Sequence, residues 1–463
     1  MKGDNKMKSF GLFNQTLEER RDMILNGKLM NTLLFLSVPT LVMCLIQSLI
    51  PIIDSLFLNR TSGYVVAASV GFVVPIINIL NGMSMGLGVS GMAMIGSANG
   101  SGNKELVRKI ATQLMVVGFL AGIVMAPFCF VSGLIATRFI NSEIAGDVFI
   151  YLGLYSFVMP FLFLTAIFNS IKNGIGQPEA TLYRMIFLLV GKVVFNTIYL
   201  YVLHLGTIGS VLGSLSSYFC ISVWMYYDLF IKDSDLKLSL KDFHFDKEII
   251  EETFRLGVPA MINHMTVNVG FVLINMEVQK YGGNIMNAQT IAINLSTICF
   301  LIPSSLSTTV TTMVSMNIGV GRSERAKNTF YRASIVAIII SFIIIVVFFP
   351  FAKPLVLLFH TSESMLGITI DAVKIYTVAI IGFSLYMIAQ GAFIGLGKTK
   401  IPVFTGVLRI WLLRYLFILA FENSMGVYSV FWGNVFSNTV AGLICFVIAL
   451  KVPWESSVKL VHS

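Results

Sequence analysis

The feature that most constrains this chain is an apolar run of about 20 residues that recurs along its whole length. Such a run is what an α-helix needs to cross a bilayer core of about 30 Å. Backbone N–H and C=O groups cannot stay unpaired in lipid, and the runs lack the alternation of barrel strands, so we expect membrane-spanning helices. We place twelve spans near residues 33–58, 66–95, 111–136, 148–171, 182–203, 207–231, 256–279, 287–315, 333–358, 370–394, 402–421 and 425–450.

The overall composition agrees with this interpretation. Hydrophobic residues make up 56% of the 463 residues and charged residues 12%, which is too apolar for an ordinary soluble domain. The sequence has no GxxxxGK[ST] phosphate-binding loop and no soluble segment long enough for an ATPase domain. We therefore predict an all-α integral membrane protein that is not an enzyme. If it is a transporter, its energy must come from an ion gradient, the substrate gradient or a separate subunit.

The net charge of +9 is distributed unevenly among the predicted loops. Alternate loops are rich in basic residues, whereas those between them hold few, among them Arg60, Arg138 and Lys280. By the positive-inside rule, both termini are cytoplasmic and the protein spans the plasma (inner) membrane several times. The charge is thus a topology signal, and we expect a lipid bilayer and no nucleic acid as partner. The basic loops contain Lys104, Arg108 and Lys109; Lys232, Lys237, Lys241, Lys247 and Arg255; and Arg322, Arg325, Lys327 and Arg332.

The segment before the first span has two possible structures. Residues 1–32 lack the cleavage site of a removable signal peptide, so we predict a cytoplasmic N-terminal segment that stays attached. Within it, residues 11–25 fit either a short amphipathic helix on the membrane surface or a disordered tail.

The cysteines and histidines do not indicate a metal site. The five residues of each type are scattered, without CxxC spacing or a histidine cluster, so we expect no metal and no other cofactor. His264, in the seventh span, fits either a packed structural residue or a residue that lines a cavity.

The sequence repeats itself with a period of about 220 residues. Each predicted half holds six spans, and six is even, so both halves enter the membrane from the same side. Such parallel repeats place a substrate site between two bundles that rock against each other. We predict a first bundle at 33–231, a cytoplasmic linker at 232–255, a second bundle at 256–450 and a cytoplasmic tail at 451–463, in a monomer. The repeated segments are LSVP (36–39) and LGVP (256–259), GSGN (100–103) and GVGR (319–322), and NGIGQ (173–177) and IGLGK (394–398).

These repeated segments, together with PIIDSLFLN at 51–59 and the turns NGIGQP and IGLGKT, resemble the multidrug and toxic compound extrusion (MATE) family, closest to its DinF-like branch. The resemblance covers nearly the whole chain. It implies two six-helix bundles around a V-shaped cavity. It also implies export of amphipathic, often cationic, compounds in exchange for H⁺ or Na⁺.

The resemblance also implies a cation or proton site in the first bundle. Its parts are an aspartate on span one, an asparagine and an aspartate one turn apart on span five, and a threonine on span six. The aspartate of span one is retained as Asp54, the two positions on span five are Lys192 and Asn196, and the threonine is replaced by Ser214. An ammonium group repels Na⁺ and competes for Asp54, so we expect H⁺ rather than Na⁺ as the coupling ion.

Lys192 needs a partner because a charge at the bilayer centre costs about 2.5–3.5 kcal/mol on insertion scales. Asp54 is the natural candidate, and the pair fits either a built-in cation that takes part in coupling or a static structural bridge. Counting residues places Asp54 near the outer end of span one and Lys192 near the middle of span five. That difference corresponds to about 10 Å in depth, which helix tilt and the lysine stem must bridge.

The second half carries its own charged residues within predicted spans. Arg409 and Arg414 lie on span eleven, and each fits a structural or a substrate-binding role. In an α-helix, residues five apart differ by about 140°, so the two need not share a face. Glu277, near the outer end of span seven, fits a gate or rim position.

Three functions remain open at this point. The first is a secondary active exporter of amphipathic drugs or metabolites, driven by H⁺ antiport with alternating access. The second is a flippase or exporter for an anionic or lipid-linked substrate, because Lys192, Arg409 and Arg414 would make an unusually positive cavity. The third, a membrane scaffold or receptor, fits poorly with the intramembrane charges and the repeat.

Overall fold

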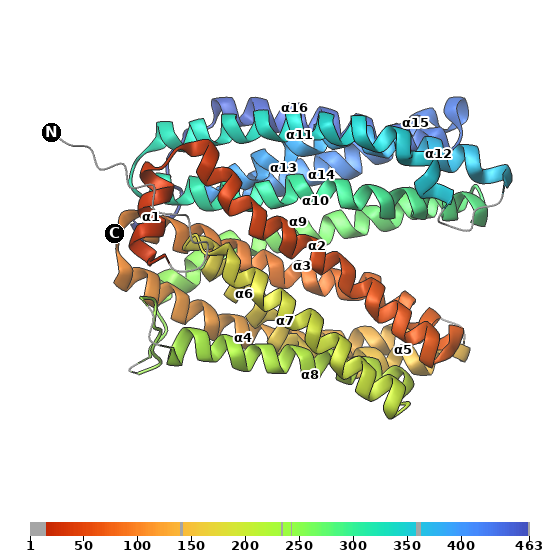
Figure 1. The fold of residues 1–463 in the computed structure, drawn as a ribbon, viewed down its shortest axis with the longest axis horizontal. Coiled ribbons are helices and arrows are strands. Elements are labelled where there is room, and N and C mark those ends of the chain that lie inside the picture. Colours follow the sequence, from red (N-terminus) through yellow and green to blue (C-terminus); the bar gives the residue numbers. More distant parts are fainter. Residues whose placement is uncertain (1–14, 139–141, 233–234, 242, 358–362, 462–463) are drawn as a thin grey trace.

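Long helices that run side by side make up most of the molecule (Figure 1). A computed structural model describes residues 15–138, 142–232, 235–241, 243–357 and 363–461. Twelve helical segments within these ranges are long and apolar enough to cross a membrane, and no described residue lies in a strand. The predicted all-α class and the number of spans are therefore confirmed.

The helices fall into two halves. The first half contains α1 (Leu17–Asn26), α2 (Leu29–Thr61), α3 (Gly63–Ser101), α4 (Lys104–Ala136), α5 (Ser142–Tyr155), the 3-10 turn η1 (Ser156–Val158), α6 (Met159–Gly174), α7 (Pro178–Asn196), the π-helix η2 (Thr197–Val202), α8 (Gly206–Tyr226) and the π-helix η3 (Tyr227–Ile231). The second half contains α9 (Lys247–Gln279), α10 (Gly283–Gly319), α11 (Ser323–Leu357), α12 (Glu363–Val378), α13 (Ile380–Gly395), α14 (Lys400–Val407), the π-helix η4 (Leu408–Tyr415), α15 (Leu416–Met425), α16 (Tyr428–Lys451) and the 3-10 turn η5 (Lys459–Val461). The ribbons of the two halves converge near α1 and diverge towards the opposite end, in a V-shaped outline (Figure 1).

The backbone repeats with the period that the sequence predicts. Three pairs of glycines with positive φ lie about 220 residues apart, at turns that follow corresponding helices. A positive φ favours glycine because other residues place Cβ too close to the backbone there. The repeated GxG turns are therefore conformational requirements shared by both halves. The pairs are Gly102 and Gly321, Gly176 and Gly397, and Gly206 and Gly426.

Helix α9 begins earlier than the apolar pattern predicts. Its first residue is Lys247, inside the predicted linker and about two turns before the expected start at 256. The cause is a cap, because the carboxylate of Asp246 accepts hydrogen bonds from the backbone N–H groups of Glu248 and Ile249. A hydrogen bond from Lys109 holds the pKa of Asp246 below its usual range, so the capping carboxylate stays charged in mildly acidic solution.

Of the two structures proposed for residues 11–25, the helix is the one observed for the described part. Helix α1 starts with a capping box in which Thr16 and Glu19 exchange side-chain to backbone hydrogen bonds. It packs into the protein instead of lying on a membrane surface, because Arg20 and Ile24 are buried. Residues 11–14 lie outside the described ranges.

Helix α1 connects the two halves. Its Arg20 forms a buried ion pair with Glu179 of α7, with Nη2 and Oε1 2.7 Å apart. At its C-terminal end, Arg322 donates to the carbonyl oxygen of Leu25 at 2.9 Å, and Arg325 of α11 donates to the carbonyls of the same turn. Arginines from the second half thus satisfy carbonyl groups that the end of the helix leaves unpaired.

The two halves also meet backbone to backbone where α3 crosses α10. A Cβ atom on Gly100 would lie 2.1 Å from the carbonyl oxygen of Met316, and one on Gly319 would lie 2.0 Å from that of Ser97. No larger side chain fits at either position without separating the helices. The end of the molecule at α1, which we call the α1 end, is therefore closed in this conformation.

Helices α2 and α9 pass from one half to the other. In α2, Leu33 is buried in a core cluster of the second half, whereas Leu58 belongs to a cluster of the first. In α9 the order is reversed, because Ile249 packs in the first half and Ile274 in the second. The start of α2 thus packs in the core of the second half, and the start of α9 packs in the core of the first half.

We predict that the contact between α1 and α7 stabilises the fold. The Arg20→Met substitution leaves Glu179 buried without its partner, which costs about 3 kcal/mol for pairs of this kind. We expect the apparent Tm of the purified protein in detergent to fall by several degrees. The control Lys104→Gln removes an exposed pair with Glu18 and should change the Tm little. Equal Tm values for both variants would contradict the prediction.

Candidate functional site

Four predicted residues meet in the first half, and we call them the Lys192 cluster: Asp54, Lys192, Asn196 and Ser214. The Nζ atom of Lys192 lies 2.6 Å from Oδ2 of Asp54 and 2.6 Å from Oγ of Ser214. The amide of Asn196 donates to Oδ1 of Asp54 at 2.8 Å. The structure therefore brings together all the residues that the sequence proposed for this site.

Three helices position the cluster. Lys192 and Asn196 lie one turn apart on α7 and so face the same side, Asp54 comes from α2 and Ser214 from α8. The side chain of Lys192 is 5% exposed and that of Asp54 19%. The pair is thus largely shielded from solvent.

Asp54 and Lys192 are in direct contact, so the depth difference of about 10 Å expected from residue counting is bridged in the structure. Helix α2 continues to Thr61, three residues beyond the predicted limit at 58. At about 1.5 Å per residue this extension covers about 4.5 Å of the expected difference.

Both carboxylate oxygens of Asp54 are engaged by N–H donors. Lys192 occupies one oxygen and Asn196 the other, so a Na⁺ ion would have to displace the ammonium group before it could bind. Na⁺ is a hard cation that requires several oxygen ligands and is repelled by a nearby ammonium. The donor set observed here does not fit a Na⁺ site.

The sequence analysis did not identify several residues that lie next to the Lys192 cluster. Tyr151, Tyr155 and Tyr218 lie near enough to Asp54 to interact with it electrostatically. Gly213 is required as well, because a Cβ atom there would lie 2.2 Å from Oδ1 of Asn196. Aromatic residues are too frequent in this chain for single tyrosines to stand out.

The second half encloses a cavity of about 630 Å³. Residues of α9, α10, α12, α13, η4 and α16 line it, and Pro75, Asn78 and Ile79 of α3 contribute part of the wall. Its lining combines aromatic rings with amide groups, so it offers both stacking surfaces and hydrogen-bond partners. The aromatic residues are Phe271, Phe300, Tyr376, Phe383 and Tyr386, and the amides include Asn263, Asn268, Asn275, Gln390, Asn434 and Asn438.

Arg409 and Arg414 both line this cavity. Arg409 donates to Oδ1 of Asn438 at 3.0 Å, and its guanidinium carbon lies 4.6 Å from the ring centroid of Tyr386. Arg414 donates to the hydroxyl of Tyr376 at 3.0 Å. Among the described residues, neither arginine has an ion pair or a partner for its buried Nε group.

The shared orientation of Arg409 and Arg414 differs from the expectation for an α-helix. The segment that carries them, η4, is a π-helix of eight residues. Hydrogen bonds from i to i+5 make residues five apart neighbours on one face. No local pattern indicated this change of helix type, so the 140° separation expected for an α-helix was wrong.

The cavity is positively charged. Its described lining contains two arginines and neither aspartate nor glutamate. Arg409 and Arg414 are only 6% and 3% exposed, so their charges are poorly screened by solvent. The amide oxygen of Asn438 beside Arg409, the hydroxyl of Tyr376 beside Arg414 and nearby aromatic rings compensate these charges only in part.

His264 and Glu277 have different positions. His264 is among the residues that line the cavity. Glu277 does not line it; instead it pairs with Lys280 and accepts a hydrogen bond from Tyr415 at 3.3 Å. Glu277 thus joins α9 to η4 near the end opposite α1.

The amide residues of the cavity were also missed, although a pattern existed. His264, Asn268, Phe271 and Asn275 follow one another at intervals of four, three and four residues, which places them on one helix face. Asn434 and Asn438 are similarly one turn apart on α16. Polar residues repeated at helical spacing within an apolar span would have indicated this lining.

The arrangement of the helices matches that of known membrane transporters. An outward-facing MATE transporter of the MOP superfamily has a TM-score of 0.88, with 19% sequence identity over 97% of this chain and 100% of its own. A MOP superfamily transporter from Pyrococcus furiosus, whose binding pocket is described as having reverse polarity, also has a TM-score of 0.88, with 20% identity over 97% and 100%. This likeness shows the fold, a multi-pass bundle with twelve candidate membrane spans among the described residues.

The sequence identifies the family. The MatE family model matches residues 39–198 and 259–419, one segment in each half, and this chain belongs to the MATE family. It is therefore a transporter and not an enzyme. The chain is 23% identical to the probable multidrug resistance protein YoeA of Bacillus subtilis, over 81% of this chain and 83% of that protein. It is 22% identical to the multidrug export protein MepA of Staphylococcus saprophyticus, over 89% and 91%.

We predict that Asp54 and Lys192 are energetically coupled. The Asp54→Asn and Lys192→Met substitutions should each lower the apparent Tm, because each leaves a charge without its partner. The double variant should lose less stability than the sum of the two losses, by about 1–3 kcal/mol. As a control, Lys192→Met combined with Glu277→Gln should be additive. Additive losses for Asp54→Asn and Lys192→Met would show that the pair contributes no coupling energy.

Proposed function

We propose that this protein is a secondary active exporter of amphipathic compounds that carry an acidic group. The observation that carries this proposal is the cavity of the second half, in which Arg409 and Arg414 are buried without a carboxylate among the described lining residues. Buried charges in membrane proteins are usually paired, and a carboxylate, sulfonate or phosphate on a bound compound would supply the missing partner. The aromatic walls would hold its apolar part.

Export of cationic drugs is the second candidate, because relatives such as MepA are named multidrug export proteins. The charge of the cavity disfavours it. At about 6 Å and an effective dielectric constant of about 20, two like charges repel by about 3 kcal/mol. A cation–π contact with one aromatic ring returns only about 0.5–2 kcal/mol. A permanent cation near both arginines would therefore be bound poorly.

Transport requires the closed end to open, and we propose alternating access between the two halves. The contacts that would have to break lie at the α1 end, namely the crossing at Gly100 and Gly319 and the arginine contacts to the end of α1. We place this end and both termini in the cytoplasm, because the basic loops lie there. The conformation described here would then be closed to the cytoplasm.

Coupling to H⁺ is proposed for the Lys192 cluster. Lys192 occupies the position where the family resemblance implies a mobile cation, so it acts as a built-in cation held by Asp54. Protonation of Asp54 would remove the attraction and free α2 to move relative to α7. Na⁺ would have to displace the ammonium group, so we propose that Na⁺ does not drive transport.

The sign of the substrate charge determines how transport depends on the membrane potential. Movement of one elementary charge across 100 mV changes the free energy by about 2.3 kcal/mol. An inside-negative potential favours the exit of an anion and the entry of a proton, so exchange of the two would move charge inward in both steps. Export of an anion would therefore be strongly voltage-driven.

We predict selective transport of acidic amphipaths by proteoliposomes. An interior-positive K⁺ diffusion potential should increase uptake of a fluorescent aromatic sulfonate, whereas ethidium, a permanent cation, should not be transported. Arg409→Gln and Arg414→Gln should each reduce sulfonate uptake about tenfold or more, because a hydrogen bond to a charged group contributes about 1.5–3 kcal/mol.

The control for this prediction is Lys353→Gln, which removes one exposed positive charge of α11 outside the cavity. It should transport the sulfonate at the wild-type rate. Transport of ethidium in preference to the sulfonate, with wild-type rates in both arginine variants, would favour cation export and refute the acidic-substrate proposal.

We predict that Lys192→Met uncouples transport from the proton gradient. In proteoliposomes with an imposed pH difference, the wild-type rate should follow the gradient, and that of Lys192→Met should not. Replacement of Na⁺ by K⁺ on both sides should leave the wild-type rate unchanged. An unchanged rate and pH dependence in Lys192→Met would exclude a coupling role for this residue.

A further inference from the structure

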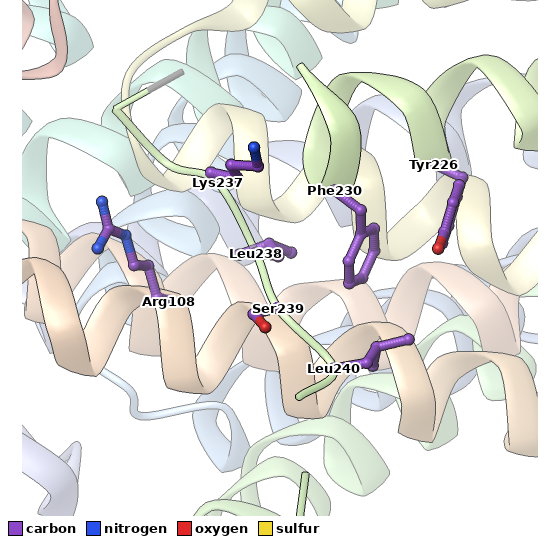
Figure 2. Close-up of a pocket in the computed structure, with 7 residues that line it drawn as sticks. All are labelled: Arg108, Tyr226, Phe230, Lys237, Leu238, Ser239 and Leu240. Carbon is purple, nitrogen blue, oxygen red and sulfur yellow. The ribbon is translucent and has the colours of Figure 1, made fainter. Parts of the chain in front are cut away.

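A second pocket lies outside the cavity of the second half, on the first half and near α1, whose Leu17 donates its backbone N–H to the neighbouring Asp235. Figure 2 shows the residues that line it. It has a volume of about 480 Å³ and is formed by α4, the end of α8 with η3, and the chain segment at 235–241. The residues that line it are Arg108, Tyr226, Phe230, Lys237, Leu238, Ser239 and Leu240. The proposed transport function uses none of them.

One side of this pocket is basic. The side chains of Arg108 and Lys237 lie on the same side in Figure 2. Nη2 of Arg108 donates to the backbone carbonyl of Asp235 at 3.0 Å, and no ion pair with a described carboxylate involves either Arg108 or Lys237. The neighbouring Lys109, in contrast, is 2.5 Å from the carboxylate of Asp246. The pocket thus contains two positive charges that no described carboxylate neutralises, whereas the charge of the adjacent Lys109 is neutralised by Asp246.

The other side of the pocket is apolar. Tyr226 and Phe230 stack with their ring centroids 4.9 Å apart, and Leu240 lies below them in Figure 2. Phe219 and Val223 precede this pair on α8 at helical spacing, so an apolar stripe leads along the helix into the pocket. Phe219, Val223 and Tyr226 are 52%, 54% and 49% exposed. In a membrane-spanning helix, such a stripe faces lipid chains.

We propose that this pocket binds an anionic phospholipid of the leaflet at the α1 end. The phosphate lies between Arg108 and Lys237, and one acyl chain follows Tyr226, Val223 and Phe219 along α8. Charge complementarity selects an anionic headgroup, because the basic side of the pocket has no carboxylate of its own to neutralise it. The apolar stripe requires a chain, so a free phosphate would fill only half of the site.

The test uses the full-length protein in detergent and measures its apparent Tm. Dioleoyl phosphatidylglycerol should raise the Tm by several degrees. Dioleoyl phosphatidylcholine and glycerol 3-phosphate should raise it much less, because one lacks net charge and the other lacks the acyl chains. A stabilisation by glycerol 3-phosphate equal to that by phosphatidylglycerol would show a phosphate site without a lipid. Equal stabilisation by both lipids would overturn the proposal.

Variants of the pocket residues test whether the lipid-dependent rise in Tm arises from binding in this pocket. Arg108→Gln combined with Lys237→Gln should abolish most of the difference between the two lipids, and Lys237→Gln alone, a change at an exposed residue, should reduce it. The control Arg332→Gln with Lys353→Gln removes the same charge from exposed positions of α11. It should keep the wild-type response. A full response in Arg108→Gln with Lys237→Gln, or an equal loss in the control, would contradict binding in this pocket.

Discussion

A charge buried in a membrane protein needs a counter-charge or a strong hydrogen-bond partner, and the two halves of this protein meet this requirement differently. In the first half, Lys192 is paired with Asp54 at 2.6 Å, so the site is balanced as it stands. In the second half, Arg409 and Arg414 form no ion pair with a described carboxylate, and their polar partners include the amide of Asn438 and the hydroxyl of Tyr376. The balanced site suits internal coupling, whereas the unbalanced one suits a bound anion.

Much of the fold could be predicted because a membrane leaves few choices. Apolar runs of sufficient length indicated the twelve helices, and three pairs of similar segments about 220 residues apart, two of them with GxG turns, indicated the repeat. The limits of α9 could not be predicted from hydropathy, since the capping residue Asp246 lies in a polar segment. The burial of α1 depends on partners distant in sequence, such as Glu179, and no local pattern reports them.

The candidate sites were also predictable to different degrees, because some of their features depend on local sequence and others on helix geometry or distant neighbours. Lys192 and Asp54 could be paired from sequence because a lone charge in lipid demands a partner of opposite sign. Arg409 and Arg414 could not be assigned to one face, because η4 departs from α-helical geometry. The amide lining was visible as a helical pattern on α9, but its meaning depends on the cavity that the neighbouring helices create.

The choice of basic residue in each half agrees with the coupling and anion-binding roles that we propose. Lys192 on α7 and Arg409 on η4 lie on the fifth and eleventh spans, which correspond in the repeat. Lysine can lose its proton in a protein interior, and its compact ammonium group can take the place of a small cation. Arginine stays charged under all physiological conditions, and its planar donors match carboxylate, sulfonate and phosphate groups. A coupling residue must change its interactions during the cycle, whereas an anion receptor must keep its charge. Duplication of one bundle, followed by different charges on corresponding helices, would separate the two proposed tasks and keep Asp54 from neutralising the arginines in the cavity of the second half.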